Sequence, residues 1–229
     1  MHVTNSHPLA FFEIGLKLKV LLMWICLGFF FQLFGANGEA DRGWLLIKEK
    51  NGVKVYEKEL DDRIAFRGVG IIPGKPEELV GVLHNPNRWK FWIEDLKEGK
   101  LLEQKSKFHF IFCQVINAPW PVKDRELVYE SVVKRTGESK IVIEMKSVDH
   151  PSVKKTGKRV RATLEYATYM IEPIDDKKML VTFENLSNPN GRMPEFLTNW
   201  ASQTYPLSIF SGLRREMENS NLIRVSLPE

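Results

Sequence analysis

Histidines and glutamates on predicted strands are the side chains of this 229-residue chain that could carry acid–base chemistry. His109 stands between two phenylalanines in an apolar run, where it could face a cavity and act as a general base. Carboxylates that could also point inward lie on later segments of alternating polarity, at Glu144, Glu165 and Glu184. Their spacing does not pair an acid with a base, so an enzyme acting on a small apolar substrate is only the alternative prediction.

The sequence lacks the common catalytic and metal-binding motifs. It contains no HExxH pair, no GxSxG elbow and no Gly-rich phosphate loop. His84, His109 and His150 are scattered along the chain and do not have the spacing of metal ligands. We therefore predict no catalytic residue, no metal site and no cofactor.

A charged bend separates two apolar runs at residues 117–130. Prolines flank Trp120, and charged side chains follow from Lys123 to Glu126. The prolines stiffen the bend because they fix φ. A tryptophan ring can rest at an apolar mouth or at a membrane interface with its N–H satisfied. The bend is therefore a candidate for contact with an apolar ligand or with a membrane.

Arg125 is the expected inward-pointing charge of this bend. Arg125 and Glu126 begin the next strand on opposite faces, so only one of them can point inward. A buried charge needs a partner, either the polar head of a lipid or a protein carboxylate such as Glu144, Glu165 or Glu184. The alternative is a solvated turn cluster that only fixes the bend, and the residues themselves do not separate the two.

The composition favours one globular domain that does not bind nucleic acid. Hydrophobic residues make up 43% of the chain and charged residues 27%, with a net charge of +4. No short Lys/Arg-rich run of the kind that binds nucleic acid is present. The mild positive surplus still permits a weak attraction to anionic membrane surfaces.

Residues 1–40 have the layout of a secretory signal. Lys17 and Lys19 precede the uncharged run Val20–Phe31, and small residues follow it. A run of this length suits a signal peptide better than a full membrane span. We predict a signal peptide, or alternatively an uncleaved membrane anchor, and hence a periplasmic, secreted or membrane-anchored protein. Cleavage would leave Cys113 as the single cysteine, without a disulfide partner.

The predicted elements after residue 40 are helices around a strand-rich middle. Asp41 is expected to cap a helix over residues 43–50 that stops at Asn51-Gly52, and a second helix covers residues 77–85. Short turns between the strands favour antiparallel pairing. The strands are expected over residues 53–60, 64–72, 100–104, 108–116, 126–134, 140–148, 159–174 and 179–186.

Alternating polarity over residues 159–170 predicts a strand with one packed and one wet face. The packed face is expected to contain Val160, Ala162, Leu164, Tyr166 and Met170.

An amphipathic helix is predicted after Asn190-Gly191, with a bend at Pro206. Its apolar residues recur at helical spacing, at Phe196, Trp200, Leu207, Phe210, Leu213 and Met217. A curved antiparallel sheet wrapped around this helix would bury both apolar surfaces in an α+β fold. Periodicity does not distinguish an enclosed cavity from a filled core, so an interaction module without a cavity remains an alternative.

This order of elements resembles the START (steroidogenic acute regulatory-related lipid transfer) domain of the helix-grip superfamily over roughly residues 41–220. Local motifs that carry the resemblance occur in the family's order: NGVKVYEKE, FRGVGII, FWIEDLKEGKLLE, Asp124–Val128 and Asn190–Pro194. In the fourth motif, Glu126 and Leu127 stand where the family has Asp and Phe.

The resemblance implies a helix-grip domain over residues 41–229 that binds a lipid or sterol-like molecule in an internal cavity. It places the loop 117–125 at the mouth of that cavity, near the C-terminal helix. It also implies transient membrane contact and transfer of the ligand between membranes. The ligand-binding residues expected on this basis are Trp120, Arg125, Tyr166, Phe196, Trp200, Leu207 and Phe210.

Overall fold

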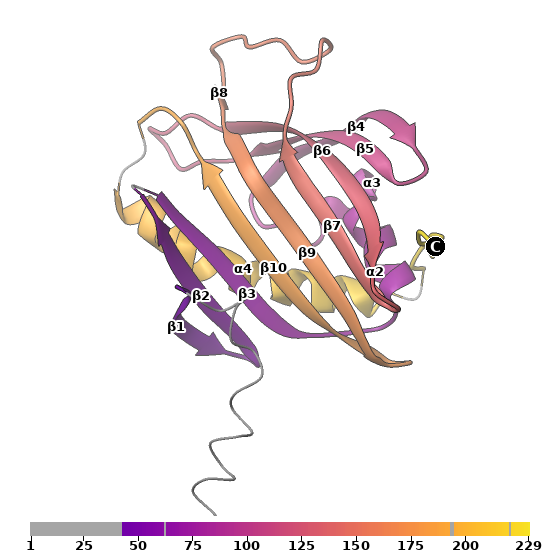
Figure 1. Cartoon of the computed structure of the whole chain (residues 1–229). Helices are drawn as coiled ribbons and strands as arrows, with labels where there is room; N and C mark the ends of the chain where they lie inside the picture. The colour runs from indigo at the N-terminus through magenta and orange to yellow at the C-terminus, as the bar shows by residue number, and fades with distance from the viewer. Residues whose placement is uncertain (1–42, 62, 193–194, 220) are drawn as a thin grey trace, which may run out of the picture. The chain divides into compact units, whose positions relative to one another are not determined.

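A single antiparallel sheet dominates the structure (Figure 1). The computed structural model describes residues 43–61, 63–192, 195–219 and 221–229, with the backbone alone over residues 195–203. The predicted signal or anchor at residues 1–40 lies outside this part of the chain. Nine of its ten strands pair in the order β1-β2-β3-β10-β9-β7-β6-β5-β4, and the tenth, β8, pairs in parallel with β6. Their bounds are β1 Leu45–Lys50, β2 Val53–Leu60, β3 Arg63–Pro73, β4 Leu96–Ser106, β5 His109–Ile116, β6 Arg125–Thr136, β7 Lys140–Ser147, β8 Val160–Arg161, β9 Thr163–Asp175 and β10 Lys178–Asn188.

Helix α4 (Glu195–Met217) lies across one face of this sheet (Figure 1). The shorter helices α2 (Pro76–Leu83) and α3 (Pro86–Trp89) connect β3 to β4, and α2 packs against α4. The predicted α+β helix-grip fold, a curved antiparallel sheet around a long C-terminal helix, is confirmed. Within the described part of the chain, no helix combines the length and the apolar character that crossing a membrane requires.

The predicted helix over residues 43–50 is wrong, because this segment forms β1. Asn51 and Gly52 have φ values of 53° and 67°, and they are the two-residue loop between β1 and β2. An Asn-Gly pair with positive φ at both positions forms the tight turn that suits the twist of a β-hairpin. This pair therefore marks a hairpin turn and not the end of a helix.

A β-bulge on β9 reverses part of the predicted alternation. Leu186 pairs with Tyr166, whereas the next residue, Ser187, pairs with Leu164, so Glu165 is an extra residue. An extra residue moves every later side chain to the other face. Leu164 faces α4 as predicted, but Tyr166 and Met170 lie on the face turned away from α4. The inner face continues instead with Ala167, Tyr169 and Ile171, which are buried.

The C-terminal half of α4 approaches the sheet and the residues after α3 very closely. A Cβ atom added at Gly68 or Gly70 of β3 would lie 2.8 or 3.0 Å from the Phe210 ring. A Cβ atom added at Gly212 would lie 2.1 Å from the carbonyl oxygen of Trp92. The absence of side chains at these glycines therefore sets the distance between the helix and its neighbours.

Polar contacts anchor the same end of α4. Arg214 donates to the carbonyl oxygens of Asn51 and Ile71, at 2.6 and 2.9 Å. Arg88 donates to both carboxylate oxygens of the buried Glu216, at 2.7 and 3.0 Å. Such two-point contacts between a guanidinium and a carboxylate fix orientation as well as distance.

We expect Gly212→Ala to lower the free energy of unfolding by about 2 kcal/mol or more, because a backbone oxygen cannot yield to the new methyl group. Alanine is otherwise the better helix former by about 1 kcal/mol, so a purely local effect would have the opposite sign. Urea unfolding of the full chain measures the change. The exposed neighbour provides the control, since Ser211→Ala should change stability by less than about 0.5 kcal/mol. Stabilisation by Gly212→Ala would contradict the close packing.

Candidate functional site

A small cavity lies between the inner face of the sheet and the helices. Its volume is about 80 Å³, and residues of α2, α3, β5, β6, β7, β9, β10 and α4 line it, together with the turn after α3. From α4, Tyr205 and Ile209 close one side. The cavity therefore sits where strands far apart in the sequence converge under one helix.

Aromatic rings form much of the cavity wall. Trp89 meets Phe112 edge-on, with ring centroids 5.0 Å apart, and Tyr169 stacks on Phe183 at 4.5 Å. Aromatic pairs in such arrangements add to the free energy gained by burying apolar area. A rigid apolar wall of this kind suits the hydrocarbon part of a ligand.

His84 and Ser131 form a hydrogen-bonded pair in the cavity wall. Nδ1 of His84 donates to the Val80 carbonyl at 3.0 Å, which leaves Nε2 to accept from the Ser131 hydroxyl at 2.9 Å. Burial lowers the pKa of His84 to about 4, so the imidazole is neutral at physiological pH. A general base works best when its pKa lies near the operating pH. This histidine is therefore better placed to shape the wall than to take a proton.

The other polar groups of the wall are also uncharged. Burial raises the pKa of Tyr205 to about 12 and raises that of Tyr129 and Tyr169 well above the ordinary value. None of the described residues that line the cavity is Asp, Glu, Lys or Arg. The wall is therefore electrically neutral at physiological pH.

Two buried polar atoms of cavity-lining residues lack a hydrogen-bond partner among the described residues. They are Nε1 of Trp92, a donor, and Oδ1 of Asn185, an acceptor. Trp92 is 4% exposed and Asn185 is 8% exposed. Native proteins leave few buried polar atoms unpaired, so each of these calls for an explanation.

Arg125 lies at the edge of the sheet and is 7% exposed. Its guanidinium donates to the backbone carbonyls of Lys123, Pro189, Asn190 and Arg192. The predicted carboxylate partners are wrong, because backbone oxygens satisfy the charge. Arg125 thus joins the loop 117–124 to the segment before α4, and it is not among the residues that line the cavity.

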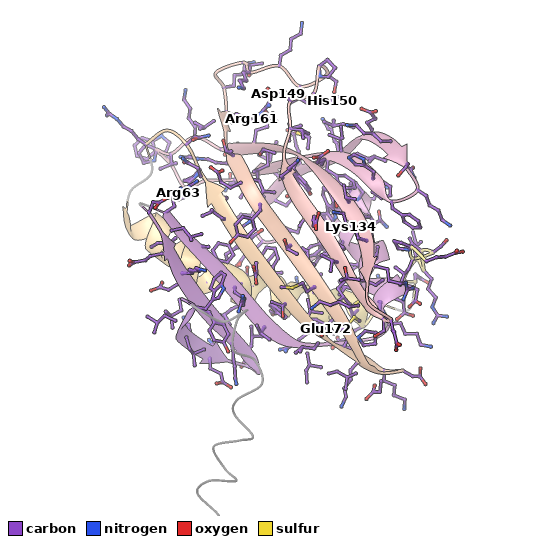
Figure 2. The ribbon with its side chains drawn as sticks, viewed as in Figure 1. Arg63, Lys134, Asp149, His150, Arg161 and Glu172 are labelled. Atoms are coloured by element: carbon purple, nitrogen blue, oxygen red, sulfur yellow. The ribbon has the colours of Figure 1, made fainter. Side chains whose placement is uncertain are left out.

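The three carboxylates predicted as possible partners of Arg125 pair with other cations. Glu144 pairs with Lys134, Glu165 with Arg63 and Glu184 with Arg67. Figure 2 shows Lys134 and Arg63 on the sheet face turned away from α4. These pairs belong to the outer face of the sheet and not to the cavity.

His109, the candidate base of the alternative enzyme prediction, also lies on the outer face. Nε2 of His109 is 3.0 Å from a carboxylate oxygen of Glu130, and neither residue lines the cavity. In the residues that the structure describes, no three His, Cys, Asp or Glu side chains gather as a group that could hold a metal ion.

The remaining predicted ligand contacts are placed as follows. Trp120 is 93% exposed on the loop between β5 and β6. Leu207 lines a groove between α4 and the β1–β2 hairpin, and Phe210 is buried against β3. The side chains of Phe196 and Trp200 are not among those that the structure describes. Tyr166 is on the outer face, so none of the predicted side chains that the structure describes lines the cavity.

Sequence reasoning did not assign the polar cavity residues to a site, although one of them carried a signal. Val181, Phe183 and Asn185 alternate on β10, so an amide occupies a position where the pattern calls for an apolar side chain. Trp89 and Trp92 are buried and also line the cavity. His84 gave no comparable signal, because it ends a helix whose orientation depends on the tertiary fold.

Known proteins are similar to this chain in both sequence and fold. The START domain family matches residues 32–222. An uncharacterised protein of Pseudomonas aeruginosa is 26% identical over 189 residues, which cover 81% of this chain and 93% of that protein. The human phosphatidylcholine transfer protein is 23% identical over 187 residues, covering 79% and 86%.

A solved structure agrees with the sequence match. The STAR-related lipid transfer protein from Xanthomonas axonopodis superimposes with a TM-score of 0.68 at 24% identity, over 77% of this chain and 99% of that one. The likeness at this identity shows the fold, and the family match spans most of the chain. This chain therefore belongs to the START domain family, whose members generally bind and transfer lipids or sterols.

Proposed function

We propose that this protein binds one hydrophobic molecule in the central cavity and carries it between membranes. The observation that supports this most is a cavity with an aromatic wall and no charged residue among its described lining, with α4 on one side. Each Å² of apolar ligand surface moved from water into such a site contributes about 25 cal/mol. Membership of the START family and the similarity to a phosphatidylcholine transfer protein support the same function.

The volume of the cavity implies that the protein opens to admit its ligand. Ordinary ligand pockets enclose about 300–1,000 Å³, whereas this cavity encloses about 80 Å³. The C-terminal half of α4 is anchored by Arg214 and Glu216. The segment 189–192, which precedes α4, and the loop 117–124 are joined through Arg125. We propose that these two segments move together, with Arg125 holding them closed.

Native mass spectrometry of the purified full chain, followed by organic extraction, tests ligand binding. We expect one bound lipid or sterol-like molecule per chain, or uptake of one from mixed lipid vesicles. The reason is that the cavity wall offers apolar contacts on several sides. A protein that stays free of any apolar molecule after incubation with vesicles would contradict the carrier function and favour a filled interaction module.

Arg125→Ala should speed amide hydrogen exchange in residues 117–124 and 189–192 and shorten the residence time of the bound molecule. The substitution removes the hydrogen bonds that join these segments. Arg125→Lys should restore little, because an ammonium group lacks the planar fork. Arg135→Ala is the matched control, since Arg135 also donates to backbone carbonyls but at the opposite end of β6. Equal exchange in the Arg125→Ala and Arg135→Ala proteins would contradict the proposal that Arg125 holds these two segments together.

A tryptophan and several lysines form a surface suited to anionic membranes, and we include membrane contact in the proposal. Lys123 donates to the Gly157 carbonyl at 3.0 Å, which joins the Trp120 loop to the loop between β7 and β8. That second loop carries the exposed Lys154, Lys155 and Lys158 and projects from the end of the sheet (Figure 1). Export or anchoring through residues 1–40 is also part of the proposal.

Sedimentation with vesicles of phosphatidylcholine, with and without phosphatidylglycerol, tests this contact. Trp120→Ala should weaken binding to both vesicles by roughly tenfold, because the ring leaves the interface. Replacing Lys154, Lys155 and Lys158 by Gln should weaken binding only to the anionic vesicles, at about 1 kcal/mol per lysine. Leu45→Ala, which truncates another exposed apolar side chain, should have no effect. Unchanged binding by both variants would exclude this surface.

A further inference from the structure

Resting on the proposed ligand-binding function, we propose that the cavity selects an uncharged apolar molecule that carries a hydroxyl group. The hydroxyl donates to Oδ1 of Asn185 and accepts from Nε1 of Trp92. A charged lipid head, such as a phosphate or a carboxylate, is disfavoured at the same place.

The two unpaired atoms define the polar part of the ligand. Trp92 Nε1 can only donate and Asn185 Oδ1 can only accept. A hydroxyl group is the smallest neutral group that can serve both, because it has one donor hydrogen and two acceptor lone pairs. Each buried polar atom left unpaired costs free energy, so a ligand that pairs them gains affinity over one that cannot.

The wall carries other polar side chains besides Trp92 and Asn185, and all of them are neutral. His84 uses both ring nitrogens, one toward the Val80 carbonyl and one toward Ser131. Gln114, also at the wall, is an uncharged amide. The hydroxyls of Tyr129, Tyr169 and Tyr205 add further neutral polar groups. Trp92 Nε1 and Asn185 Oδ1 differ from these groups because they are buried and have no hydrogen-bond partner among the described residues.

Buried charges elsewhere are satisfied away from the cavity. Arg67 pairs with Glu184 at 2.7 Å, and Arg88 pairs with Glu216. Arg125 bonds backbone carbonyls. None of these charged side chains lines the cavity. An anionic head in the cavity would meet no cation from the described wall, and an ion buried without a counter-charge is strongly destabilised.

Isothermal titration calorimetry of the full chain with three matched probes tests the proposal. The probes are 1-decanol, its methyl ether 1-methoxydecane, and decanoate at pH 8. Decanol should bind about tenfold more tightly than the ether, because the ether cannot donate to Asn185. Decanoate should bind at least tenfold more weakly than decanol, because its charge has no partner.

Two variants separate the hydrogen bonds from the packing. In Asn185→Leu, the preference for decanol over the ether should disappear, because the acceptor is gone. The extra methyl group of the ether affects binding to both proteins alike, so its contribution cancels when the preferences of the variant and the original protein are compared. Trp92→Phe should weaken decanol and ether alike, because both oxygens accept from the indole. Thermal unfolding of each variant verifies that it is folded.

The outcomes distinguish this inference from the general function. Binding of decanoate as tight as that of decanol would overturn the neutral site. An alcohol preference that survives Asn185→Leu would overturn the assigned hydrogen bond, and the carrier function would stand in both cases. Failure of all three probes to bind would overturn the carrier function and this inference together.

Discussion

The close contact between α4 and its neighbours is the constraint on which the rest of the structure depends. Phe210 lies directly over Gly68 and Gly70, and Gly212 lies against the carbonyl of Trp92. These contacts hold the C-terminal half of the helix down at one end of a sheet that twists away from it. The cavity lies beside Tyr205 and Ile209 of the same helix.

Charge is distributed to suit this arrangement. Charged side chains with little exposure have partners nearby. Arg67 pairs with Glu184 of the neighbouring strand on the outer face of the sheet, and Arg125 donates to backbone oxygens. The cavity wall is left with aromatic rings and neutral polar groups. Because ionised groups are costly to bury alone, this separation keeps the cavity compatible with an apolar ligand. It also makes Arg125 part of the support for the loops and not a ligand contact.

Much of the fold could be predicted because strand periodicity is a local property. Alternation predicted most of the strands, and short turns predicted that consecutive strands pair antiparallel. The segment of β1 was misassigned because a short apolar run suits a helix or a strand equally. Only the Asn51-Gly52 turn distinguishes the two. The bulge at Glu165 was missed because an inserted residue leaves the composition unchanged while it reverses the faces of Tyr166 and Met170.

The sequence by itself determined the family, the helix-grip architecture and the polar character of the loop around Trp120. Motif order and periodicity carry that information, because each depends on residues near one another in the chain. Only the tertiary structure decided which side chains meet in the cavity. Trp92 and Asn185 line the same cavity because of the strand order of the sheet and the position of α4. Such contacts depend on register and helix placement, which are properties of the whole packed domain and of no single segment.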